Sequence, residues 1–190
     1  MNQVLPTPMT TDEFLRWSAR RDDGRYELEG GWVIAMPSES VGHVRAKRRV
    51  EAALALAIGK AGISFYSLPD GVAVRIDERR AYEPDAVVAP LPYPPDDALE
   101  IDNPVIVVEV LSIWSIKRDL TAKVVGYARV PTIEHYVVID RDERQVLHFR
   151  RKGDVLVPPE APHVAGDTLR LDPPGLAVAV VDMLGPAPLT

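Results

Sequence analysis

The chain has 190 residues, of which 46% are hydrophobic and 26% are charged, and it contains no cysteine. This length fits one domain whose core folds without covalent staples, and the lack of cysteine excludes disulfide scaffolds, thiolate zinc sites and cysteine nucleophiles. The formal net charge of −6 is opposite to that of proteins that coat nucleic acid, so any site for a polyanion must be local.

We expect a single domain over residues 1–190, with a core at about 10–182 and a flexible tail at 185–190. No apolar run in the sequence is as long as a membrane span, and the first ten residues lack the basic start and apolar core of a signal peptide. The sequence therefore favours a cytoplasmic protein with no membrane partner.

The first third of the chain predicts two helices separated by a hairpin. Thr10 followed three residues later by Glu13 is a capping box, which indicates a short helix over about 11–20. Two short apolar runs flank Gly30-Gly31, a pattern typical of a β-hairpin with a two-residue turn. Apolar residues then recur at spacings of three and four, which predicts a long helix over roughly 41–60.

The remainder predicts several strands and one further helix. The predicted strands cover residues 63–68, 72–76, 85–89, 105–111, 135–139, 145–150 and 155–157. The run 105–111 is almost continuously apolar, as in a central strand that is covered on both faces. A helix is indicated at about 116–128, because apolar residues share one face and Pro131 follows. This order of elements predicts a mixed α/β domain.

Glu109 interrupts the apolar run of the predicted central strand. A buried carboxylate is costly unless it is paired or binds a metal, so Glu109 is either a salt-bridge partner at the strand end or a metal ligand. Asp85 begins an earlier strand directly after Pro84. If the two strands are neighbours, their carboxylates come within reach of one cation, and such hard oxygen ligands suit Mg²⁺ or Mn²⁺.

Lys123 flanks the apolar face of the predicted helix 116–128. It stands four residues after Asp119, so one interpretation is an ordinary surface ion pair or a lysine stem that reaches solvent. The alternative aims the ammonium group at Asp85 and Glu109, because a helix that packs back across its preceding strand faces that strand.

Two further groups remain open from the residues alone. Glu27 and Glu29 share one face of the first hairpin strand, and alternation favours solvated side chains although one of them could be a third carboxylate of the site. His43 lies near the start of the long helix, where it is either a polar residue of the helix terminus or a contact to phosphate. The sequence contains no glycine-rich phosphate loop, no Gly-x-Ser-x-Gly and no His-Glu-x-x-His motif, which excludes the corresponding nucleotide, serine-hydrolase and zinc-protease sites.

Several stretches in a characteristic order resemble one family. They are Tyr26-Glu27-Leu28-Glu29-Gly30, Met36-Pro37-Ser38 with His43, Pro84-Asp85, Pro104 to Ser112, Asp119 with Lys123 and Tyr127, and Glu134 to Asp140. Together they resemble the Uma family of restriction-endonuclease-like proteins, within the PD-(D/E)XK nuclease superfamily, over about residues 10–182. The resemblance implies a restriction-endonuclease-like core, that is, a central mixed β-sheet flanked by helices, with an N-terminal β-hairpin.

The resemblance also implies the composition of an active site. Asp85 and Glu109 correspond to the metal-binding carboxylates, the Val110 carbonyl to a further metal ligand, and Glu27 to the residue that completes the acidic site. The superfamily lysine normally stands two residues after the glutamate, where this chain has Leu111, and Lys123 matches the position to which members of the family have moved it. The chain also departs from the family at Ile113-Trp114, in the loop after the central strand.

The function implied is that of a Mg²⁺- or Mn²⁺-dependent endonuclease that hydrolyses DNA phosphodiester bonds. His43 and the exposed arginines of the long helix, Arg45, Arg48 and Arg49, either contact backbone phosphates or are solvated. The resemblance further implies a homodimer. The alternative is a nuclease fold without catalysis, which serves as a binding or assembly module.

Overall fold

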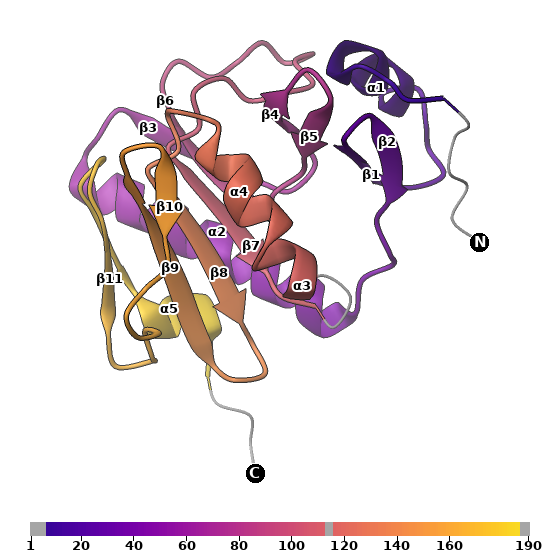
Figure 1. Cartoon of the computed structure of the whole chain (residues 1–190). Helices are drawn as coiled ribbons and strands as arrows, with labels where there is room; N and C mark the ends of the chain where they lie inside the picture. Colours follow the sequence, from indigo (N-terminus) through magenta and orange to yellow (C-terminus); the bar gives the residue numbers. More distant parts are fainter. Residues whose placement is uncertain (1–6, 113–115, 187–190) are drawn as a thin grey trace.

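A six-stranded mixed sheet lies at the centre of the computed structural model, which describes residues 7–112 and 116–186 (Figure 1). In spatial order its strands are β10 (Val155–Val157), β9 (Gln145–Lys152), β8 (His135–Asp140), β7 (Ile106–Val110), β6 (Ala86–Pro90) and β3 (Phe65–Pro69). Strands β7 and β8 pair in parallel, and the other neighbours pair antiparallel. The mixed α/β fold predicted from the sequence is therefore confirmed.

Strand β7 is buried along its whole length, as its apolar run predicts. Ile106, Val108 and Val110 pack in one core with α2 (Val41–Ala61). Val107 and Leu111 pack on the other face. There they lie in one cluster with Tyr127 of α4 (Ala122–Ala128). The described part of the chain has no helix that combines the length and the apolar character needed to cross a membrane.

The predicted hairpin forms and is part of a second sheet beside the first (Figure 1). This sheet has the order β2 (Trp32–Ala35), β1 (Tyr26–Glu29), β5 (Arg80–Tyr82) and β4 (Val74–Asp77), with α1 (Thr11–Ser18) packed on it. Gly30 and Gly31 have φ values of 59° and 89°, so the tight turn uses a left-handed backbone that glycine adopts without strain. The sequence did not predict β5, because three residues in a charged stretch carry no periodic signal.

The single helix predicted over 116–128 is wrong in detail, because the segment folds as α3 (Ile116–Asp119) and α4. At Thr121 the backbone leaves the helical region, with φ −131° and ψ −80°, and α4 begins after it. Thr121 is thus the N-cap residue of α4, a position at which threonine is common. The sequence did not predict this interruption, because the apolar residues before and after Thr121 would share one face of a continuous helix.

The C-terminal region adds elements that the sequence analysis did not predict. They are β11 (Thr168–Leu171), β12 (Leu176–Ala179) and α5 (Val180–Leu184). Strand β12 and helix α5 pack against α2 and extend the core on that side of the central sheet. They were not predicted because they are short and because the segment between the two strands, Asp172-Pro173-Pro174, indicates a turn.

Candidate active site

Glu109 on β7 and Lys123 on α4 meet in the interior. The Lys123 Nζ lies 2.7 Å from Glu109 Oε1, and the Tyr127 hydroxyl donates to the same oxygen at 2.8 Å. Only 3% of Lys123 and 4% of Glu109 is exposed. Lys123 is therefore a buried residue whose ammonium group faces Glu109, and the ion pair with Asp119 that the sequence allowed lies in the interior rather than on the surface.

Glu27 on β1 joins the same centre, although strand alternation favoured a solvated side chain. It is 1% exposed, and its Oε1 lies 3.1 Å from Lys123 Nζ. The Glu83 backbone N–H donates to this oxygen at 2.9 Å, while Arg118 pairs with Oε2 at 2.5 Å. The expectation failed because β5 and the helices α3 and α4 close over this face of β1, which the strand's own pattern does not reveal.

Close packing of α4 on the second sheet brings Lys123 to Glu27. Gly126 makes this approach possible, because a Cβ atom at this position would lie 2.5 Å from the Tyr82 ring. Tyr82 is itself buried at 1% exposure and stacks edge-on against Tyr127 with ring centroids 5.4 Å apart. A larger residue at Gly126 would push Lys123 away from the carboxylates.

Asp85 lies at the start of β6, beside Glu109. The register pairs Ala86 with Val108, so the next pair outward is Asp85 and Glu109, on neighbouring strands as the sequence analysis anticipated. Asp85 is 4% exposed, and its Oδ2 accepts the Val110 N–H at 2.7 Å. This bond fixes the carboxylate against β7.

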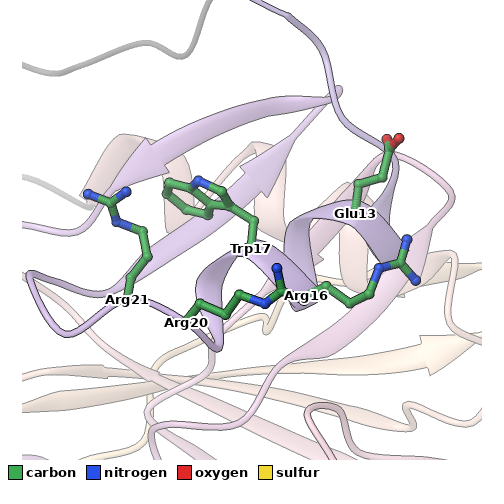
Figure 2. Close-up of a pocket in the computed structure, with 5 residues that line it drawn as sticks. All are labelled: Glu13, Arg16, Trp17, Arg20 and Arg21. Carbon is green, nitrogen blue, oxygen red and sulfur yellow. The ribbon is translucent and has the colours of Figure 1, made fainter.

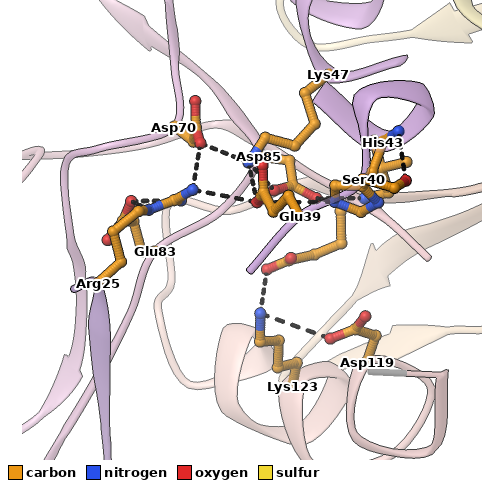
Figure 3. A network of polar contacts seen from close by, with 12 residues as sticks. Arg25, Glu39, Ser40, His43, Lys47, Asp70, Glu83, Asp85, Asp119 and Lys123 are labelled. Atoms are coloured by element: carbon orange, nitrogen blue, oxygen red, sulfur yellow. Dashed lines mark hydrogen bonds and ion pairs between the residues drawn. The ribbon is translucent and has the colours of Figure 1, made fainter. Parts of the chain in front are cut away.

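A second buried lysine, Lys47 of α2, lies on the other side of Asp85 (Figure 3). Its Nζ is 3.2 Å from Asp85 Oδ1 and 2.5 Å from both Glu39 and Asp70. Arg25 contacts the same two outer carboxylates, at 3.1 Å and 2.6 Å. The sequence analysis missed Lys47. The available signal was its place on the apolar face of α2, one helical turn before Val50.

His43 also faces the carboxylates rather than solvent. Its Nε2 lies 3.9 Å from both Glu39 Oε1 and Asp85 Oδ2, and 8% of the residue is exposed. Within residues 7–112 and 116–186, Glu39, His43 and Asp85 form the one group of three side chains whose ligand atoms lie within 4.8 Å of one another. Burial lowers the pKa of His43, against the opposing effect of Asp85 and Glu39, which favours the neutral imidazole that binds metals.

The arginines of α2 differ in their surroundings. Arg45 and Arg48 are exposed. Arg49 is half-buried and donates to the Leu184 carbonyl at 3.0 Å, so it is engaged with α5. Leu111, at the position of the usual superfamily lysine, is buried among apolar side chains. Ile113-Trp114 lies outside the described residues.

The acidic centre, defined here as Glu27, Asp85, Glu109, Asp119 and Lys123, holds more negative than positive groups. Burial raises the pKa of Glu109 well above its usual range; Lys123 opposes this effect, and the neighbouring carboxylates add to it. Burial likewise raises the pKa of Asp85. Glu27 is the exception: burial would raise its pKa, but Lys123 and Arg118 outweigh it and lower the value. The same carboxylates raise the pKa of Lys123, against burial.

Asp119 is the member of the acidic centre whose carboxylate lacks hydrogen-bond donors among the described residues. It is 1% exposed, and in the described part of the chain neither of its carboxylate oxygens has a hydrogen-bond partner. Lys123 Nζ lies 3.5 Å from its Oδ1 (Figure 3). A buried carboxylate without donors is costly unless a cation compensates it. The donor set, carboxylates with one imidazole nearby, fits a divalent ion such as Mg²⁺ or Mn²⁺.

Comparison with known proteins agrees with this arrangement. Residues 11–181 match the model of a family described as "Uma2: Putative restriction endonuclease", which confirms the resemblance inferred from the sequence. A protein of Synechocystis sp. described as "Uncharacterized protein sll1609" is 24% identical over 147 residues, which are 77% of this chain and 82% of that protein. A crystal structure titled as a putative nuclease belonging to DUF820 from Anabaena variabilis superposes with a TM-score of 0.70 at 16% identity. The superposition covers 93% of this chain and 98% of the other, and it shows that the fold is shared.

Proposed function

Because the chain belongs to the Uma2 family of putative restriction endonucleases, we propose that it is a nuclease that hydrolyses DNA phosphodiester bonds with Mg²⁺ or Mn²⁺. The observation that carries the proposal is the buried Lys123, whose ammonium group joins Glu109 to Glu27 beside Asp85. Taking charges out of water is costly, and a purely structural ion pair repays this cost poorly, which favours a functional reason for this buried group of carboxylates.

In this proposal Asp85 and Glu109 hold the divalent ion, and the Val110 carbonyl adds a ligand. Glu39 and His43 stand close enough to Asp85 to contribute from the other side. A bound ion of this kind polarises the scissile phosphate and lowers the pKa of an attacking water. Tyr127 and Lys123 fix the Glu109 carboxylate, and the Val110 amide fixes that of Asp85.

Lys123 acts on the charge that develops during hydrolysis. Its raised pKa keeps the ammonium group protonated at neutral pH, so it stabilises negative charge on the phosphate oxygens rather than accepting a proton. Glu27 holds Lys123 in place and is the residue of the centre nearest to Arg118. Asp119 would add a further negative charge to the centre that holds the ion.

DNA would approach the centre over α2, where Arg45 and Arg48 are exposed and available to backbone phosphates. We further propose a homodimer, because enzymes that cut both strands of a duplex commonly pair two sites across a twofold axis. The solution mass, measured by light scattering, tests this: a monomer at all protein concentrations removes the dimer and leaves the chemistry.

A matched pair of variants on one strand tests the function. Glu27→Gln removes a charge from the acidic centre, whereas Glu29→Gln, two residues away, removes one that pairs with Arg80 and Tyr82. With Mg²⁺ or Mn²⁺, nicking of a supercoiled plasmid should slow about 100-fold or more in the first variant and remain near wild type in the second. A folded wild-type protein that binds the ion and cuts no nucleic acid would instead identify a non-catalytic module.

A further inference from the structure

A second feature lies on α1, among residues that the acidic centre does not use. A hollow of about 340 Å³ is lined by three arginines, one tryptophan and one glutamate (Figure 2). These residues are Glu13, Arg16, Trp17, Arg20 and Arg21. In a chain of net charge −6, three arginines around one aromatic ring make a strong local departure from the overall charge.

Arg21 lies over the Trp17 ring in this hollow, and we call this pair the Arg21–Trp17 platform. The Arg21 guanidinium carbon lies 4.9 Å from the centroid of the Trp17 ring, and the indole meets Tyr26 edge-on at 4.9 Å. Asp23 fixes the guanidinium group, accepting from Nε at 2.7 Å and pairing with a terminal nitrogen. A guanidinium plane held in this way offers its outer face for stacking.

The other two arginines are free to bind an anion. Arg16 and Arg20 are exposed, and within the described residues no side-chain hydrogen bond or ion pair engages either of them. In Figure 2 the guanidinium groups of Arg16, Arg20 and Arg21 are spread out from α1 to the segment that follows it. The Glu13 carboxylate accepts from Thr10 at 2.8 Å and 2.9 Å in the helix cap, and its attraction to Arg16 is a lesser cause of its lowered pKa than these hydrogen bonds.

We propose that this arginine cluster, Arg16, Arg20 and Arg21 with Trp17, binds single-stranded nucleic acid. Backbone phosphates would pair with Arg16 and Arg20, while an unpaired base would stack on the Arg21–Trp17 platform. The choice of a nucleic acid rests on the proposed nuclease function, because an acidic peptide would satisfy the charges but would leave the platform unused.

The cluster is joined to the acidic centre through β1. Tyr26, which supports Trp17, is followed directly by Glu27, and adjacent strand residues point to opposite faces. Binding at the cluster therefore holds nucleic acid on the sheet that carries Glu27 without using any residue of the centre. The platform requires an unpaired base, so it selects single strands or strand ends over intact duplex.

Anisotropy of a labelled single-stranded oligonucleotide, measured in EDTA so that no cleavage occurs, tests the cluster. Arg16→Glu with Arg20→Glu should raise Kd about tenfold or more and reduce the salt dependence by about two ions. The control, Lys60→Glu with Lys152→Glu, makes the same charge change at two other exposed sites and should leave Kd within about twofold. Equal losses in both variants, or no loss in either, would overturn the proposal.

A further variant tests the platform itself. Arg21→Gln should remove the preference for the single strand over a duplex of the same sequence, because the stacking plane is lost. Polyglutamate that competes as well as the oligonucleotide would reveal a general polyanion surface and contradict the proposal. If the wild type cuts no nucleic acid but the double variant still loses binding, the arginine cluster stands and the nuclease proposal fails. If the wild type cuts nucleic acid and the double variant binds it unchanged, the nuclease proposal stands and the arginine cluster fails.

Discussion

Two buried lysines flank the carboxylates of this protein, and they differ in what holds them. Lys123 on α4 contacts residues of strands and helices: Glu109 on β7, Glu27 on β1 and Asp119 on α3. Lys47 on α2 contacts Asp85 and two carboxylates of the loops, Glu39 and Asp70. Both are almost fully buried, and neighbouring carboxylates raise the pKa of both.

The ion pairs of the two lysines indicate that the lysines have different roles. The partners of Lys123 include Glu109, for which Lys123 is the one ion-pair partner among the described residues. The outer partners of Lys47 also contact Arg25, so they retain a cation when Lys47 is removed. We infer that Lys123 belongs to the reacting centre, whereas Lys47 positions Asp85.

Replacing each lysine by methionine should separate these tasks most strongly. Lys123→Met leaves Glu27 and Glu109 buried with fewer cations and should lower the free energy of unfolding by about 3–5 kcal/mol. Lys47→Met should cost only about 1–3 kcal/mol, because Arg25 still compensates the outer carboxylates. Urea denaturation measures both. Equal costs would show that the two lysines are equivalent and would break the comparison.

Glu109→Gln removes one negative charge at nearly constant shape. In the metal-free protein it should raise the melting temperature, because the remaining carboxylates repel less. A divalent ion at about 100 times its Kd should stabilise the wild type by roughly 2.7 kcal/mol and the variant by much less. Calorimetry with and without Mn²⁺ decides this. A variant that is less stable without metal and responds normally to it would make Glu109 a structural partner.

The pH dependence of stability should differ between wild type and Glu109→Gln. The raised pKa of Glu109 means that the folded protein keeps a proton that the unfolded chain releases above its ordinary value of 4.5. In the metal-free protein, wild type should therefore gain stability relative to the variant as the pH falls from the folded-state pKa toward 4.5. The slope is at most roughly 1.4 kcal/mol per pH unit. A difference that does not change with pH would contradict the raised pKa.

The smallest expected effect concerns the second donor to Glu109. Tyr127→Phe removes the hydroxyl that lies 2.8 Å from Glu109 Oε1 while keeping the buried ring. The loss of one hydrogen bond to a carboxylate should cost about 1–3 kcal/mol, and Lys123 limits it to the lower end because it still contacts the same oxygen. If Tyr127→Phe lowers the free energy of unfolding as much as Lys123→Met does, Tyr127 rather than Lys123 holds the Glu109 carboxylate in place.

The sequence predicted the fold and the site best where a regular apolar pattern is interrupted by one polar residue. The apolar run of β7 indicated both the central strand and the cost of Glu109 within it, and alternation placed its side chains on the correct faces. The sequence offered the link of Lys123 to this strand as one of two interpretations, because a helix after a strand can pack back across it. The resemblance added Glu27 to the centre, where the strand pattern alone favoured solvent.

What the sequence did not reveal depends on contacts between distant segments. Glu27 is buried by β5 and by α3 and α4, none of which alters the local pattern of β1. Lys47 meets Asp70 and Glu39 in loops, whose placement follows from the assembled fold. The pair β11–β12 and helix α5 are too short for periodicity to register, and their burial becomes visible only against α2.

The most direct test of the central claim is the rate at which Asp85→Asn nicks a supercoiled plasmid with Mg²⁺ or Mn²⁺, compared with wild type. Asparagine keeps the shape of the Asp85 side chain and can still accept the Val110 N–H, but it removes the charge that would hold the ion. We predict a folded variant that cuts about 100-fold more slowly than wild type, or more slowly still. A folded variant that cuts as fast as wild type would show that the ion and the chemistry lie elsewhere.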